Sequence, residues 1–166
     1  AGPSEVTIIA DKYSNPSWVS ADLIAQAEHD EMSQSILVSD SKKIISDVIK
    51  ILKVQIRYLP KKKIVTESLK KNGVCILTKN SSQISKIINK ISPEHLEIYT
   101  KNPKQYLKNI DNAGSIFLGA YSPEAAGDYL AGPNHVLPTS GTAKFSSGLS
   151  VNDFLKKQSV INMSKT

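Results

Sequence analysis

The chain has 166 residues, 40% of them hydrophobic, so it can bury one substantial core but is short for two complete domains. Its formal net charge is +6, yet Arg57 is the single arginine, and Lys61, Lys62 and Lys63 are the only run among the 21 basic residues. Because nucleic-acid readout favours clustered arginine and interleaved aromatic side chains, this pattern argues against a nucleic-acid partner and indicates solvated lysine faces.

The first part of the chain alternates short apolar runs with helical patterns. Val6–Ala10 is a β-branched run typical of a buried strand, and Asn15-Pro16 predicts the start of a helix that continues to about Asp30. Ile36–Val38 predicts a second strand. After Asp40-Ser41, apolar residues recur at helical spacing until Pro60 closes the segment.

The same alternation continues through the middle of the chain. The expected elements are a helix over Ile64–Lys71, a strand over Val74–Thr78, a helix over Ser82–Ile91 and two short strands, Leu96–Tyr99 and Ser115–Leu118. Strands that alternate with helices predict βαβ units, so the fold class is α/β, with a mostly parallel sheet and flanking helices.

The texture changes at about Tyr121, where glycines and prolines punctuate a polar stretch with few periodic apolar positions. Long irregular segments in compact domains are usually functional or disordered. Beyond Ser150 we expect a short helix through Lys157 and a strand at Val160-Ile161.

Three further features concern compartment and completeness. No stretch approaches the roughly 20 apolar residues of a membrane helix, and there is no secretory leader pattern at the start. The lone Cys75 lies in an apolar run, where we expect a small core side chain rather than a nucleophile. We therefore expect a cytoplasmic protein with no membrane partner, and the start at Ala1 without methionine suggests a piece of a longer chain.

Two short motifs carry side chains suited to chemistry. Gln26 and His29 stand three residues apart on the first predicted helix, so they share a face and can both bind one metal ion, although a surface or capping role is the commoner one for such a pair. Glu94 and His95 lie between a helix and a strand and are suited to proton transfer near neutrality, but Ser-Pro before them also opens plain turns.

The irregular segment adds Asp128 and His135, which neither helical nor strand patterning explains. A loop aspartate is commonly a turn or cap residue. All three histidines, however, lie beside a carboxylate or in a glycine-rich loop rather than on an apolar stripe. A metal or acid–base site is therefore a reasonable hypothesis.

Taken together, these motifs resemble the histidinol dehydrogenase family. Five blocks occur in the family's order: Ala1–Glu5, Gln26–Asp30, Ser92–Glu97, Asn112–Gly119 and Gly127–Thr139. The match continues through Ser140–Leu149 and is loosest between Ser41 and Lys90. Lys144 stands where the family more often has arginine.

The resemblance implies a zinc-dependent enzyme that oxidises L-histidinol through L-histidinaldehyde to L-histidine with two NAD, in the last steps of histidine biosynthesis. It implies one zinc ion per subunit, held by Gln26, His29 and Asp128. The catalytic pair would be Glu94 and His95. The resemblance further assigns substrate contacts to seven residues: Ser4, Gln26, His29, His95, Asp128, Tyr129 and His135.

The resemblance also implies an incomplete Rossmann-like domain. Residues 1–148 would belong to the catalytic domain and 149–166 would start a C-terminal helical or dimerisation segment of a homodimer. No Gly-x-Gly-x-x-Gly element follows a strand, so no NAD-contacting residue is assigned here, and a last zinc ligand would lie beyond Thr166. We expect the isolated chain to bind zinc weakly and to have no turnover.

Two other classes stay open at this point. One is a non-catalytic binding or interaction domain that retains the fold. The other is a basic nucleic-acid-binding α/β domain, which only the net charge supports.

Overall fold

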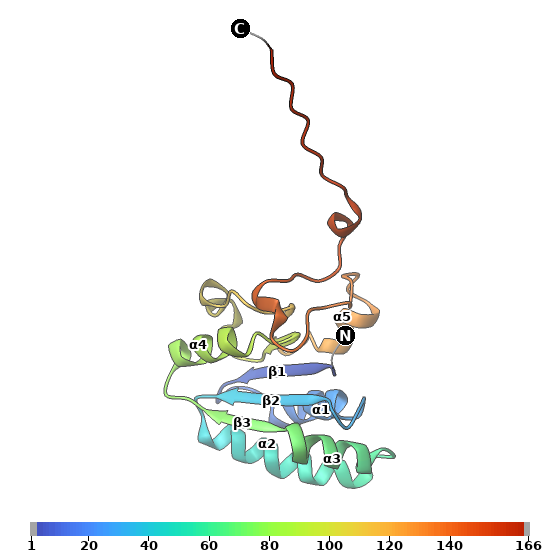
Figure 1. Ribbon diagram of the computed structural model, residues 1–166. Coiled ribbons are helices and arrows are strands. Elements are labelled where there is room, and N and C mark those ends of the chain that lie inside the picture. The colour runs from blue at the N-terminus through green and yellow to red at the C-terminus, as the bar shows by residue number, and fades with distance from the viewer. Residues whose placement is uncertain (1–2, 165–166) are drawn as a thin grey trace.

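A computed structural model describes residues 3–164 and shows a single sheet with helices on both faces (Figure 1). All the described strand pairs are parallel, and the strand order is β3-β2-β1-β4-β5. The strands are β1 Glu5–Ala10, β2 Gln34–Ser39, β3 Val74–Leu77, β4 His95–Ile98 and β5 Ser115–Leu118. The predicted α/β class with a parallel sheet is confirmed.

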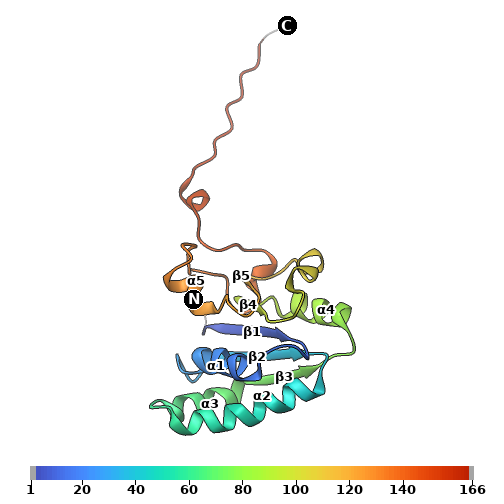
Figure 2. The ribbon, with the colours of Figure 1, turned by 180° about the vertical axis from the view of Figure 1, so that it is seen from behind.

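The longer helices connect these strands and cover the sheet. They are α1 Pro16–Ala27, α2 Lys42–Gln55, α3 Lys62–Asn72 and α4 Ser81–Ile91. A cluster around Val6, Ile8 and Leu37 packs β1 and β2 on α1 and α2, and α3 joins them through Val65 against Ile24. The opposite face carries α4 and the segment around Tyr106 and Ile110 (Figure 2).

Local capping chemistry sets the helix starts. The Asn15 side chain accepts the backbone N–H of Ser17 at 2.9 Å, and Asn80 accepts that of Gln83 at 2.9 Å. Asn15 followed by Pro16 begins α1 where the sequence predicted. The helix ends at Ala27 rather than near Asp30, so His29 lies just beyond its last turn.

Three sequence predictions were wrong. Cys75 is exposed rather than in the core, because β3 is the last strand on its side of the sheet formed by residues 3–164. The irregular segment contains a short helix, α5 Glu124–Tyr129. Residues 155–164 hold neither helix nor strand and extend away from the domain after a 3₁₀ turn at Val151–Phe154 (Figure 1).

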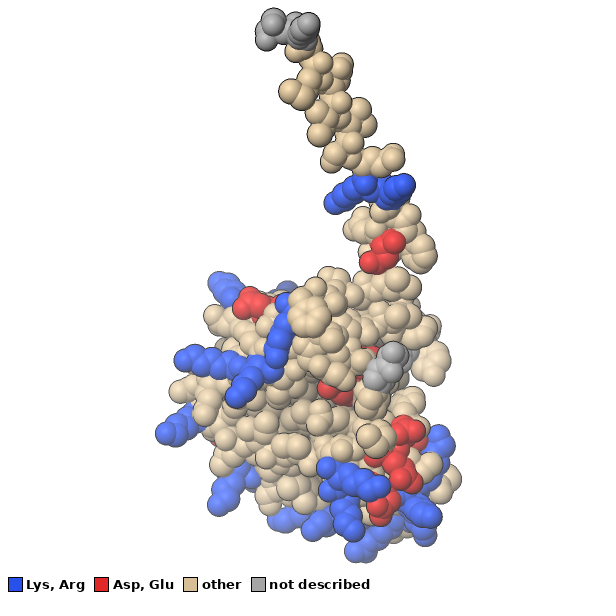
Figure 3. Space-filling model, in the orientation of Figure 1, with Lys and Arg blue, Asp and Glu red and all other residues tan. Residues whose placement is uncertain are grey.

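The surface agrees with a dispersed charge distribution. On the face in Figure 3, lysine and arginine side chains are spread along the left and lower rim, and most of the visible acidic side chains lie at the lower right. Within residues 3–164, no helix is both long and apolar enough to cross a membrane.

Candidate functional site

The candidate residues gather at the amino-terminal edge of the sheet. Helix α1 runs back against the parallel strands, so its last turn reaches the edge where β1 and β4 begin. Gln26 therefore lies near the starts of both strands, at Glu5 and His95. This edge is opposite to the carboxyl edge, where open α/β sheets usually bind ligands.

A small cavity of about 60 Å³ lies between α1 and α5. It is lined by seven residues: Asp22, Ala25, Gln26, His29, Glu124, Ala125 and Tyr129. Gln26 is buried, with 1% of its surface exposed. With its amide nitrogen turned to α5, Gln26 donates to both oxygens of the Glu124 carboxylate at 3.1 and 3.2 Å. In this orientation the amide oxygen of Gln26 is turned away from Glu124.

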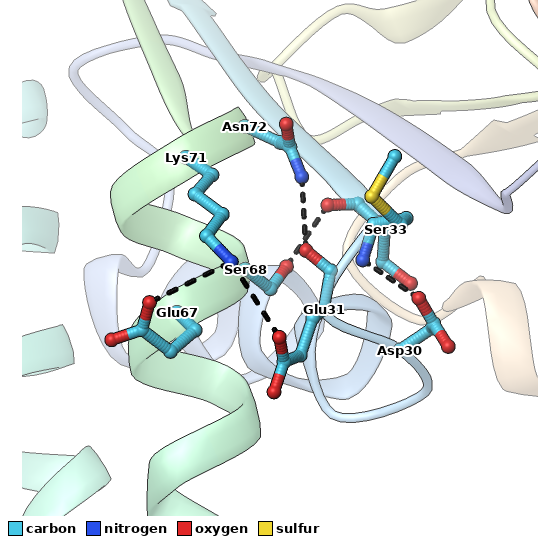
Figure 4. Close-up of polar contacts among 8 residues, drawn as sticks. Asp30, Glu31, Ser33, Glu67, Ser68, Lys71 and Asn72 are labelled. Atoms are coloured by element: carbon cyan, nitrogen blue, oxygen red, sulfur yellow. Dashed lines mark hydrogen bonds and ion pairs between the residues drawn. The ribbon is translucent and has the colours of Figure 1, made fainter.

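The loop after His29 is fastened to α3, as Figure 4 shows. The Asn72 amide donates to the Glu31 carbonyl at 3.0 Å, and the Ser68 hydroxyl donates to the Ser33 carbonyl at 2.9 Å. Lys71 lies 3.5 Å from the Glu31 carboxylate. These contacts fix the chain directly after His29 and so restrict where that exposed imidazole can lie.

His95 begins β4 and is almost fully buried, with 4% exposed. Its Nδ1 lies 3.2 Å from the Glu5 carbonyl oxygen, 3.4 Å from a Glu124 carboxylate oxygen and 3.6 Å from one of Glu94. Because a carbonyl can only accept, Nδ1 carries the hydrogen and Nε2 is the basic nitrogen. These contacts fix the orientation of the His95 ring.

Glu94 and Glu5 tie the start of β4 to neighbouring segments. A Glu94 carboxylate oxygen accepts the backbone N–H of Glu5 at 3.0 Å, and the Glu5 carboxylate accepts that of Ser140 at 2.7 Å. Burial raises the pKa of Glu5, although backbone hydrogen bonds from Ser140, Gly141 and Glu94 oppose the shift. Glu5 thus fastens the loop around Ser140 beside the candidate catalytic pair.

A row of polar side chains extends from His95 along one face of β4 and ends at Tyr99, the residue directly after the strand, because alternate residues of an extended chain share a face. It consists of His95, Glu97 and Tyr99, and the Tyr99 hydroxyl donates to the Asp22 carboxylate on α1. Glu97 is fully buried. Its burial, and to a smaller extent the negative charge of the nearby Asp22, raise the pKa of Glu97 to about 9. Glu97 is therefore protonated at neutral pH, beside the Asp22 carboxylate.

Comparison with known proteins decides the family. The family model described as histidinol dehydrogenase matches residues 1–166. This chain belongs to the histidinol dehydrogenase family. It is 55% identical over 165 residues to the histidinol dehydrogenase of Clostridium acetobutylicum, covering 99% of this chain and 38% of that relative.

Two further members of the family are similar to this chain over nearly its whole length. The histidinol dehydrogenase of Listeria monocytogenes is 48% identical over 165 residues, covering 99% of this chain and 39% of its own length. The crystal structure of histidinol dehydrogenase from Elizabethkingia anophelis superposes with a TM-score of 0.90 at 41% identity, over 94% of this chain and 36% of that one. The chain thus spans little more than a third of the length of these relatives.

Only some of the residues that the family resemblance singled out line the cavity. Gln26, His29 and Tyr129 line it. Ser4 is half-buried directly before Glu5, whereas His135 is exposed on the following loop and is not among the lining residues. Asp128 lies on α5, but its side chain is outside the described part of the structure.

Sequence reasoning missed four acidic residues of this site: Glu5, Asp22, Glu97 and Glu124. Signals for two of them were present. Asp22 precedes Gln26 by four residues and so shares its face of α1, and Glu97 follows His95 by two and so shares its face of β4. Within the described residues, no three His, Cys, Asp or Glu side chains form a group able to hold a metal ion.

Gly114 approaches the backbone of Glu94 closely. A Cβ at Gly114 would lie 2.6 Å from the Glu94 carbonyl oxygen, and the Gly114 N–H donates to the Pro93 carbonyl at 2.9 Å. We expect Gly114→Ala to displace the start of β4 and to cost about 1–3 kcal/mol of unfolding free energy in the full-length protein. Chemical denaturation measures this cost, and an unchanged midpoint would contradict the close approach.

Proposed function

We propose that the whole protein containing this chain oxidises L-histidinol through L-histidinaldehyde to L-histidine, using two NAD and one zinc ion per subunit. The supporting observation is the meeting of α1, α5 and the start of β4, where Gln26, Glu124 and His95 are linked in one polar chain. The relatives' name supplies the substrate.

The donor chemistry of the cavity fits zinc. Zinc binds nitrogen and oxygen donors, and Gln26 and His29 offer one of each on the wall of a cavity of about 60 Å³. Asp128 on α5 is our proposed third protein ligand, in keeping with the resemblance. Zinc, when bound, would orient the substrate, and NAD, when bound, would accept a hydride in each of two oxidations.

His95 is our proposed base for the first oxidation. Its Nδ1–H is held by the Glu5 carbonyl, which leaves Nε2 to take the hydroxyl proton of the alcohol as the aldehyde forms. The carboxylates of Glu94 and Glu124, within 3.6 Å of Nδ1, stabilise the resulting imidazolium.

Glu94 is our proposed base for the second stage. Its carboxylate accepts the Glu5 N–H through one oxygen and helps to remove a proton from the water that adds to the aldehyde. The hydrated aldehyde then loses a hydride and a proton to give the carboxylic acid. The burial of Glu94 and His95 keeps bulk water from the aldehyde between stages.

The contacts to NAD belong, in this proposal, to other parts of the whole protein. The turn after β1 runs from Asp11 to Asn15 without a glycine, so it lacks the phosphate-binding loop of dinucleotide folds. Residues 1–148 are proposed as part of the catalytic Rossmann-like domain. Residues 149–166 are proposed to start a helical or dimerisation segment of a cytoplasmic homodimer, and the exposed Val160, Ile161 and Met163 suit burial against another surface.

The test is the stoichiometry of the full-length, zinc-loaded protein. We expect two NADH and one histidine for each L-histidinol consumed, followed by absorbance at 340 nm and product chromatography. The isolated 166-residue chain is the control, and we expect it to give no NADH. Absence of NADH from the full-length protein would instead favour a non-catalytic binding domain that keeps the fold.

A further inference from the structure

Glu97 is a fully buried acid that the proposed chemistry does not use. It lies within β4, on the same face as His95 and Tyr99 and between them. One of its carboxyl oxygens accepts the backbone N–H of Glu124 at 2.7 Å, and the Asp22 carboxylate on α1 lies close enough to raise the pKa of Glu97. A single side chain of the sheet therefore contacts both helices that border the cavity.

Helix α5 depends on this contact for its start. The first amides of a helix have no partner inside the helix and need an acceptor from a cap residue. The cap position of α5 is Pro123, which makes no side-chain cap hydrogen bond. Glu97 supplies the acceptor from the sheet instead, and a helix of only six residues has few other hydrogen bonds to hold it.

The Glu124 backbone held in this way carries a side chain that connects the two halves of the site. Its carboxylate accepts from the Gln26 amide at 3.1 and 3.2 Å and lies 3.4 Å from His95 Nδ1. Asp22, the second partner of Glu97, precedes Gln26 by one turn of α1. Displacing Glu97 would thus disturb both Gln26, the proposed metal ligand, and His95, the proposed base.

We propose that Glu97 is a positioning residue that joins β4, α1 and α5 through one carboxyl group and so sets Glu124 between Gln26 and His95. The inference rests on the proposed function only for its effect on turnover. Burial and the neighbouring acids keep Glu97 protonated, so glutamine matches it in charge and shape: its oxygen can accept the Glu124 N–H, and its amide nitrogen is a donor on the side of Asp22.

The experiment compares Glu97→Gln with Glu97→Leu in the full-length protein. Glu67→Gln, at a surface ion pair with Lys71, is the matched control. We expect Glu97→Leu to speed hydrogen exchange at the start of α5 about tenfold or more, because the Glu124 N–H loses its acceptor. We also expect it to lower kcat per zinc-loaded, folded enzyme about tenfold or more with a smaller change in KM. Glu97→Gln and the control should stay near the wild type in both measurements.

Each outcome decides the role of Glu97. Equal damage from glutamine and leucine, or an unchanged exchange rate and kcat in Glu97→Leu, would overturn the proposal. If Glu97→Leu does not fold, Glu97→Asp retracts the carboxyl group by one methylene and is expected to show the same loss. Hydrogen exchange needs no substrate, so it tests Glu97 even if the wild type proves inactive on L-histidinol.

Discussion

His95→Ala in the full-length protein is expected to lower kcat by about 10²–10⁴-fold, the usual contribution of a positioned general base. The zinc content should stay near that of the wild type, because Nδ1 of His95 faces the Glu5 carbonyl and two carboxylates rather than the cavity between α1 and α5. Steady-state kinetics together with metal analysis by atomic absorption measures both effects.

His29→Ala provides the contrast. His29 lines the cavity and is exposed, so its loss should empty the proposed metal site while leaving the buried His95 cluster in place. We expect zinc to dissociate on dialysis and activity to return in part with excess zinc. Equal zinc contents in the two histidine variants would show that this division of roles is wrong.

The sheet and its helices were predictable because each depends on local pattern. The β-branched run before Ala10 is buried on both faces, as a central parallel strand requires, and Asn15-Pro16 begins α1 through a cap that the sequence displays. The edge position of β3 and the irregular C-terminal residues 155–164 were not predictable from local pattern. The apolar run around Cys75 indicates a strand, but nothing within it tells a central strand from an edge.

Helix α5 escaped prediction because tertiary contacts hold it. Gly127 lies in its middle and lowers its helix propensity, yet a Cβ there would lie 2.7 Å from the Phe117 ring, so glycine permits the helix to pack on β5. Phe117 in turn packs on His95, with ring centroids 6.2 Å apart. The sequence shows the propensity cost of Gly127, whereas its benefit appears only in the folded protein.

In the candidate site, the residues that depend on local spacing were predictable, and those that depend on tertiary contacts were not. Spacing placed Gln26 and His29 on one face of a helix, and both line the cavity. The partners that orient these groups come from distant segments: Glu124 lies 98 positions after Gln26, counting from 26 to 124, and contacts it through α5. Hydrogen bonds between such segments leave no periodic signal in the chain.

Glu124→Ala in the full-length protein is expected to weaken zinc binding by about 10–100-fold, the usual effect of removing a group that orients a metal ligand. The Glu124 carboxylate accepts from the Gln26 amide nitrogen, and that contact keeps the amide oxygen available for a metal. Without it, the Gln26 amide is free to turn and loses part of its preorganisation. Competition with a chromophoric chelator gives the affinity directly.

Glu28→Ala is the matched control, because Glu28 stands between Gln26 and His29 in sequence but lines a different surface of α1, beside Tyr58 and Leu59. Its zinc affinity should equal that of the wild type, which separates a local effect on Gln26 from a general loss of charge near the helix. If Glu124→Ala binds zinc as tightly as Glu28→Ala, then Gln26 either needs no orienting partner or is not a zinc ligand. A parallel measurement on Gln26→Ala distinguishes these two cases, since only a true ligand loses affinity on its own removal.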